Sequence, residues 1–318
     1  MILELWSARR EGRFGIKHYI LAWIVSARLF AVPWVALFTL FGALLAGITS
    51  VEMLAASIAV VVCALLASHF NNNYMDVLLG VDRYVDSPEE AKRLCSTIKP
   101  YTAAAWIVPL RITSIEFQKI NEHLFLALAA IIYALMYSRD LTALLATLPV
   151  AVLGIILVKG YTTLFKPRGL GELACFLGHG FGATAFGYLS QKPDLVMAFL
   201  AAIPPGLISA LAYSIDQFVD IKTDFVRRVR AVYESWFNSR MPLGLYVIVA
   251  FGFWINTVIA WVAADIYPRG VLLVLALTPL VLYYAPQLEY DRDRTLARVV
   301  IISVFLVPLL MCVGALIR

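Results

Sequence analysis

The chain has 318 residues, of which 62% are hydrophobic and 15% are charged, with a mean hydropathy of +0.83. A soluble protein of this size carries roughly 25% charged residues, so the composition excludes an ordinary soluble domain and predicts a membrane protein. The net charge of +5 does not indicate a nucleic-acid binder, because the basic residues are spread over several loops. The four cysteines form no Cys-x-x-Cys pair, which argues against a disulfide framework and a zinc site.

The apolar runs of the chain predict an all-α membrane fold. Residues 1–17 are basic and amphipathic, and we expect them to form a retained interfacial segment. One membrane crossing needs about 20 apolar residues, so the chain is expected to form about nine transmembrane helices in one bundle with cytoplasmic cap loops, as a single domain over residues 1–318. The nine runs lie at about 21–47, 51–70, 120–137, 141–158, 173–190, 195–215, 242–264, 269–286 and 298–316.

The loops between these runs alternate in charge. With nine crossings, the N-terminus shares one side of the membrane with the long segments at about 71–119, 159–172 and 216–241. The positive-inside rule places this side in the cytoplasm and the C-terminus outside. Only four of the 26 lysines and arginines fall on the other side: Arg139, Lys192, Arg269 and Arg318.

A first polar cluster follows the second apolar run. Asn72 and Asp76 are four residues apart, so they share one face of a helix. Gly80 is expected to end that helix and to turn Asp82 back toward the same ligand. Carboxylates near membrane depth are costly and need a compensating partner, so the cluster predicts a bound cation.

A second acidic cluster follows the sixth apolar run. Asp216, Asp220 and Asp224 are spaced four apart and stack on one helix face, where like charges repel unless a cation joins them. Mg²⁺ is typically held by one or two carboxylates together with water and substrate phosphate. Two such clusters on one face of the membrane predict an enzyme that binds Mg²⁺ and acts on a diphosphate, with turnover depending most on Asp76 and Asp220.

Metal ions neutralise the charge that develops on a departing diphosphate. If the organic group is allylic, the broken C–O bond leaves a delocalised carbocation, which aromatic faces attract by roughly 0.5–2 kcal/mol each. Cationic side chains near the clusters would add charge toward the diphosphate. The candidate substrate-binding residues are Tyr74, Tyr161, Lys166, Arg168, Asp216 and Arg228.

At these residues the chain resembles the UbiA superfamily of intramembrane prenyltransferases. The first cluster matches that family's N-x-x-x-D-x-x-x-G-[IV]-D motif from Asn72 to Asp82, and Asp220 with Asp224 matches its second D-x-x-x-D pair. Tyr161-Thr162 followed by Gly169–Glu172 is similar to a segment of the 1,4-dihydroxy-2-naphthoate prenyltransferase branch. The resemblance implies nine helices and two Mg²⁺ ions that bind a polyprenyl diphosphate donor. It implies the following metal ligands: Asn72, Asp76, Asp82, Asp220 and Asp224.

The resemblance also implies an aromatic acceptor, a quinone precursor such as dihydroxynaphthoate, in an enzyme embedded in the cell membrane. Two alternatives stay open. The acceptor could be a non-aromatic lipid such as geranylgeranylglyceryl phosphate. The chain could also be a transporter whose acidic clusters coordinate a transported cation. Transporters often show internal repeats and helices broken at mid-membrane; the sequence shows no repeat, and its acidic clusters lie at helix ends, which disfavours transport.

Overall fold

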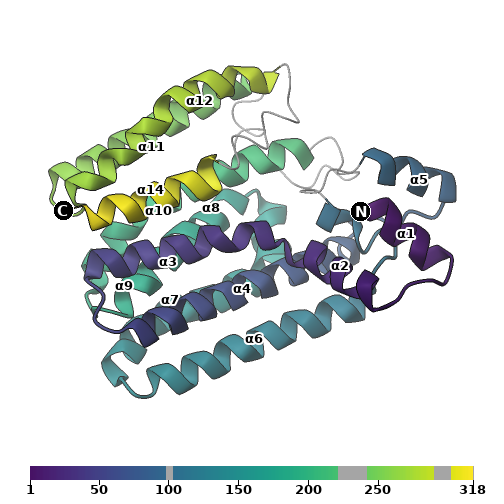
Figure 1. The fold of residues 1–318 in the computed structure, drawn as a ribbon, viewed down its shortest axis with the longest axis horizontal. Coiled ribbons are helices and arrows are strands. Elements are labelled where there is room, and N and C mark those ends of the chain that lie inside the picture. The colour runs from purple at the N-terminus through teal and green to yellow at the C-terminus, as the bar shows by residue number, and fades with distance from the viewer. Residues whose placement is uncertain (98–102, 221–241, 290–301, 318) are drawn as a thin grey trace.

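The computed structural model describes residues 1–97, 103–220, 242–289 and 302–317. All regular secondary structure in this part of the chain is helical (Figure 1). The long helices are α3 (Val32–Ala46), α4 (Val51–Leu78), α6 (Ile115–Tyr137), α7 (Leu141–Gly160), α10 (Leu195–Asp220) and α11 (Leu243–Ala263). The shorter helices are α1 (Ile2–Arg10), α2 (Ile16–Ala27), α5 (Pro88–Thr97), α8 (Gly171–Cys175), α9 (Ala183–Leu189), α12 (Thr278–Tyr284) and α14 (Val307–Leu316).

Seven helical segments of the described residues are long and apolar enough to cross a membrane, so the chain is a multi-pass membrane protein. The nine crossings expected from the sequence are not all confirmed. The run at 173–190 does form a helix, from α8 through a π-helical stretch to α9, but it is not among the seven segments. The last run is described only from Ile302 onward.

Two predicted boundaries were wrong. The first run is not one helix, because α2 ends at Ala27 and Arg28 takes a left-handed backbone with φ 49° before the chain re-enters a helix. Helix α4 continues past the apolar run to Leu78, so Asn72 and Asp76 lie within it, as their spacing predicted. The segment 159–172, expected to be a loop, is mostly helical.

Four of the long helices begin at a side chain that caps a backbone N–H, as their sequences favour. Ser50 accepts a hydrogen bond from the third residue of α4, and Ser114 does so for α6. Asp140 and Asp194 cap α7 and α10 in the same way. These caps fix where each membrane helix starts, and therefore which of its residues lie at each end of the bundle.

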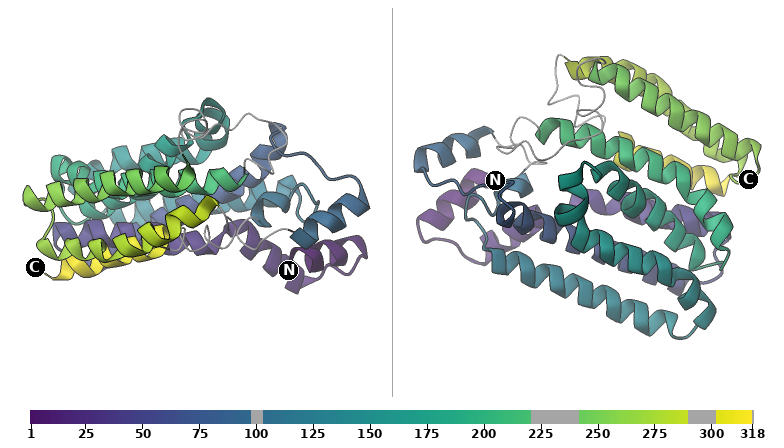
Figure 2. Two further views of the ribbon diagram at one scale, coloured as in Figure 1. Left: turned by 90° about the horizontal axis from the view of Figure 1, so that it is seen from above. Right: turned by 180° about the vertical axis from the view of Figure 1, so that it is seen from behind.

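The bundle is flat, with α11 and α12 along one edge and α6 along the other (Figures 1 and 2). Its centre is held by glycines that bring backbones together. A Cβ added at Gly42 of α3 would lie 2.0 Å from the carbonyl oxygen of Thr184, and one at Gly187 of α9 would lie 2.0 Å from that of Thr39. Helices α3 and α9 therefore pack at a distance that only small residues permit.

A small helical cap covers one end of the bundle (Figure 1). It consists of α1, α2, α5 and the segment 103–112, and it has an apolar core of its own that includes Leu5, Val25 and Ile107. Cys95 of α5 is part of this core, where burial raises the pKa of its thiol to about 11. We call this element the end cap. It lies at the end of the bundle that carries the first polar cluster.

Candidate functional site

Helix α4 ends as the sequence predicts. Gly80 has φ 68°, and its N–H donates to the carbonyl of Val77 at 3.1 Å while the N–H of Val81 donates to the carbonyl of Asp76 at 2.8 Å. This pair of bonds is the Schellman termination that a glycine after a helix allows. The N–H of Asp82 also donates to the carbonyl of Asp76, at 3.0 Å. The chain thus folds back over the last turn of α4 and brings residue 82 close to residue 76.

Asp76 forms an ion pair with Lys166. The ammonium Nζ donates to Asp76 Oδ2 at 2.9 Å, and the two side chains are only 10% and 7% exposed, respectively. One turn earlier in α4, Asn72 Oδ1 accepts a hydrogen bond from Thr162 at 3.0 Å. Two of the predicted site residues in α4 therefore contact a single segment that follows α7.

The segment after α7 leaves the ordinary α-helical register. A π-helical turn spans Tyr161–Phe165, and a short 3₁₀ turn, Lys166–Arg168, follows it. π-turns within helices occur frequently at functional sites. This one aims Thr162 and Lys166 at α4. Arg168 lies further on, is exposed, and donates to the carbonyl of Leu164 at 2.9 Å, so the structure does not bring it to the ion pair.

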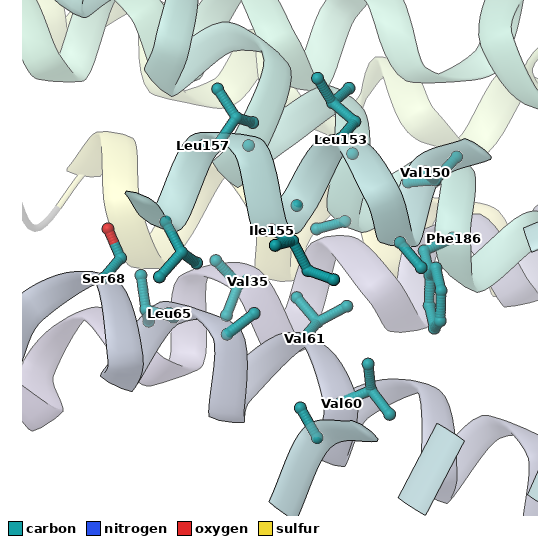
Figure 3. Close-up of a pocket in the computed structure, with 18 of the residues that line it drawn as sticks. Val35, Val60, Val61, Leu65, Ser68, Val150, Leu153, Ile155, Leu157 and Phe186 are labelled. Atoms are coloured by element: carbon teal, nitrogen blue, oxygen red, sulfur yellow. The ribbon is translucent and has the colours of Figure 1, made fainter. Parts of the chain in front are cut away.

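An apolar cavity of about 600 Å³ adjoins this site. It is lined by aliphatic side chains of α4, α6 and α7 and by the helix from α8 to α9, with Ser68 at one end and Phe186 at the other (Figure 3). Its lining residues on α7 run from Leu148 to Val158 and are followed by Tyr161, a length of about 20 Å at 1.5 Å per residue. Tyr161 and Ser68 are neighbours of Thr162 and Asn72 in their helices, so the cavity begins beside the polar cluster.

Tyr74 faces a different way from Asp76. Its hydroxyl donates to Glu122 Oε2 of α6 at 2.7 Å, and Asn71 donates to Glu122 Oε1 at 3.0 Å. Lys159 of α7 forms an ion pair with the same carboxylate, which is fully buried. Tyr74 is thus used to join α4 to α6, and the structure does not place it beside the ion pair of Asp76. Sequence reasoning missed Glu122, although a carboxylate within an apolar run was its signal.

The second acidic cluster is largely outside the described residues. The backbone of α10 reaches Asp220 at the end of the bundle that carries α4's last turn (Figure 1). The side chains of Asp216 and Asp220, and all of Asp224 and Arg228, lie outside the described part. Within the part that the structure describes, no three His, Cys, Asp or Glu side chains gather closely enough to hold a metal ion.

The sequence matches no model of a known protein family and no curated protein. The fold does match a solved structure, described as that of digeranylgeranylglyceryl phosphate synthase in membranes. The match has a TM-score of 0.54 at 15% sequence identity and covers 94% of this chain and 99% of the other. At that identity the likeness is one of fold, and over nearly its whole length the chain shares the helical architecture of that membrane synthase.

Proposed function

We propose that this protein transfers a prenyl group from a prenyl diphosphate to a lipid acceptor within the membrane. The observation that carries the proposal is the buried Asp76–Lys166 pair beside one end of a 600 Å³ apolar cavity. A substrate with a long apolar chain and a charged head needs these two environments side by side. Ligand cavities of roughly 300–1,000 Å³ with a few polar groups are typical of small-molecule sites.

The two parts of the site divide the donor between them. The prenyl chain lies in the cavity, where its burial is favourable by about 25 cal/mol for each Å² of apolar surface. The diphosphate lies at the Lys166 ammonium, which provides charge at a position shielded from water. Tyr161 lines the cavity at the end where the polar cluster begins, a position from which its ring would stabilise positive charge on the carbon that bears the departing oxygen.

The polar cluster suits Mg²⁺. Asp76 Oδ1 is buried and has no hydrogen-bond partner, which leaves a carboxylate oxygen ready for a hard cation. We propose that Asn72, Asp76 and Asp82 hold Mg²⁺ together with Asp220 and Asp224, which lie outside the described side chains. When bound, the metal would neutralise charge on the departing diphosphate. Lys166 would then pair with the diphosphate in place of Asp76.

The acceptor we propose is a non-aromatic lipid such as geranylgeranylglyceryl phosphate. The fold likeness is to a synthase named for a lipid product of that kind, and no comparison supports the aromatic, menaquinone-type acceptor expected from the motifs. Following the charge of the loops, the site and the N-terminus face the cytoplasm.

The test uses purified protein, Mg²⁺, labelled geranylgeranyl diphosphate, and two acceptors: geranylgeranylglyceryl phosphate and dihydroxynaphthoate. We expect the lipid to be prenylated and the aromatic acid not. Asp76→Asn and Asp220→Asn should each lose at least about a hundredfold in turnover, since each 1.36 kcal/mol of barrier is tenfold in rate. Asp265→Asn is the control, because Asp265 follows α11 and lies beside Ile317 near the C-terminus, away from the last turn of α4, with a positive φ that asparagine tolerates. Full activity in EDTA would rule out the metal-assisted mechanism, and prenylation of the aromatic acid alone would rule out the lipid acceptor.

A further inference from the structure

Arg28 lies at the junction of α2 and α3 with a backbone conformation that residues other than glycine rarely adopt. Its φ of 49° and ψ of 50° are left-handed. A non-glycine residue in this region costs about 1–3 kcal/mol and persists only where its surroundings hold it, often at a functional site.

Two hydrogen bonds from α4 hold the backbone before Arg28. His69 Nδ1 lies 2.8 Å from the carbonyl oxygen of Ala27, and Asn73 Nδ2 donates to the carbonyl of Ser26 at 3.1 Å. Because His69 and Asn73 are four residues apart, they lie on one face of α4, one turn apart. The chain is therefore fastened along α4 just before Arg28, and the guanidinium is directed onto the same helix face.

The guanidinium of Arg28 is only partly satisfied. Nη2 donates to Asn73 Oδ1 at a long 3.3 Å, and Nε is buried with no hydrogen-bond partner. Among the described residues, no carboxylate forms an ion pair with it. A buried donor left unsatisfied is unfavourable, so the arrangement calls for an additional acceptor, and a permanently charged guanidinium favours phosphate oxygens.

His69 presents a second ring nitrogen at the same place. A carbonyl oxygen can only accept, so the bond to Ala27 requires the hydrogen to sit on Nδ1. The other nitrogen, Nε2, then carries a lone pair when the ring is neutral. In the described part of the chain, Nε2 forms no hydrogen bond.

Around α4, His69 and Asn73 face a different direction from Ser68, which lines the donor's cavity. At 100° per residue, Ser68 lies about 40° to one side of Asn72 around α4, while His69 and Asn73 lie roughly 60° and 100° to the other side. Asp76 falls between, at about 40° on that second side. On α4, the cavity-lining Ser68 therefore faces one flank of the Asn72–Asp76 stripe, and His69 and Asn73 face the other.

We propose that Arg28 and His69 form the headgroup site of the acceptor, an apolar lipid that carries both a phosphate and a free hydroxyl; this rests on the proposed function. Arg28 binds the phosphate. His69 Nε2 takes the hydroxyl proton while the acceptor oxygen bonds to the allylic carbon and the bond from that carbon to the diphosphate oxygen breaks. The diphosphate leaves with the electron pair of that bond, and the histidine later returns the proton to water.

The spacing suits this chemistry. Asn73, which contacts Arg28, lies four residues nearer the end of α4 than His69, a rise of about 6 Å. A phosphate at the end of the bundle, a hydroxyl one turn deeper and an apolar chain beyond it match that order.

His69→Asn tests the base. Asparagine keeps an N–H at the position of Nδ1, so the bond to Ala27 survives while the proton-accepting Nε2 is lost. Prenyl transfer should fall by about 10²- to 10⁴-fold, while Mg²⁺-dependent release of diphosphate without acceptor stays unchanged. The matched control is His123→Asn, because His123 makes the same bond to a backbone carbonyl but is exposed on α6. Equal transfer by wild type and His69→Asn would overturn the role of His69.

Arg28→Gln tests the phosphate site. The KM for the phosphate-bearing acceptor should rise about tenfold or more, with the KM for the donor changed less than about twofold. The control is Arg111→Gln, since Arg111 also has a positive φ, of 56°, but pairs with Asp86 on the surface. A rise in the donor KM alone would assign Arg28 to the diphosphate and overturn the proposal.

A binding measurement separates this proposal from the proposed function. The shift in thermal unfolding caused by the acceptor lipid is measured for wild type and Arg28→Gln, with its phosphate-free analogue in parallel. An absence of prenyl transfer by the wild-type protein would refute the proposed function. A phosphate-dependent shift in thermal unfolding that persists in Arg28→Gln would refute the role of Arg28.

Discussion

Replacing Lys166 with methionine would leave the buried carboxylate of Asp76 without its ion-pair partner. In the structure, Asp76 Oδ2 pairs with Lys166, Oδ1 has no partner, and the side chain is 7% exposed. Removing one partner of a buried ion pair is destabilising by about 3–5 kcal/mol. We expect Lys166→Met to lower the free energy of unfolding by about that amount. In Lys166→Met/Asp76→Asn the carboxylate becomes a neutral amide, and about 2 kcal/mol or more should be regained.

Thermal and denaturant unfolding in detergent, without divalent cations, measures both variants. Lys159→Met provides the comparison: Lys159 also pairs with a buried carboxylate, but it is 45% exposed, and Glu122 keeps its hydrogen bonds from Tyr74 and Asn71. Lys159→Met should therefore lower the free energy of unfolding by less than Lys166→Met does. If Lys166→Met and Lys166→Met/Asp76→Asn have the same free energy of unfolding, Lys166 does not stabilise the protein through the ion pair, and the reasoning fails.

Three further outcomes are expected. Gly187→Ala should destabilise the protein by about 1–3 kcal/mol by overpacking, because the new Cβ would lie 2.0 Å from a carbonyl oxygen of α3. Gly252→Ala should not destabilise it in this way, because the space around Gly252 is open. Equal stabilities of the two variants would contradict the close packing. Ala130→Phe fills the cavity and should shift the ratio of kcat/KM toward shorter prenyl donors; an unchanged ratio would place the chain elsewhere. Ser87 precedes α5 in the end cap, and Ser138 follows α6 at the opposite end of the bundle. Cysteines introduced there should react with a membrane-impermeant maleimide from opposite sides, and labelling of both from one side would contradict the topology.

The sequence predicted the helical membrane fold and the first polar cluster because both depend on local patterns. Long apolar runs predict membrane helices, and the four-residue spacing of Asn72 and Asp76 places them on one face. Gly80 predicts the end of α4, and the structure confirms it. Lys166 was expected near the cluster from its charge, and the structure places it against Asp76.

What the sequence could not predict depends on helix register and on distant contacts. Tyr74 is next to the cluster in sequence, yet it turns toward α6 because Glu122 offers its hydroxyl a buried acceptor. The apolar run around Arg28 predicts one continuous helix. The structure interrupts this helix at Arg28, where the chain is bonded to α4. Such features arise between segments more than 40 residues apart, where no periodicity carries a signal.

The π-turn at Tyr161–Phe165 makes the site sensitive to chain length as well as to residue type. A π-turn accommodates one residue more than an α-helical turn, so the direction of Lys166 depends on how many residues precede it. Deleting a single residue from this stretch would restore a regular helix and rotate everything after it by about 100°. Lys166 would then point away from Asp76 with its own chemistry intact. For this protein, an insertion or deletion there is a graver change than most substitutions, and a related chain would have to match the length of this segment to keep the same site.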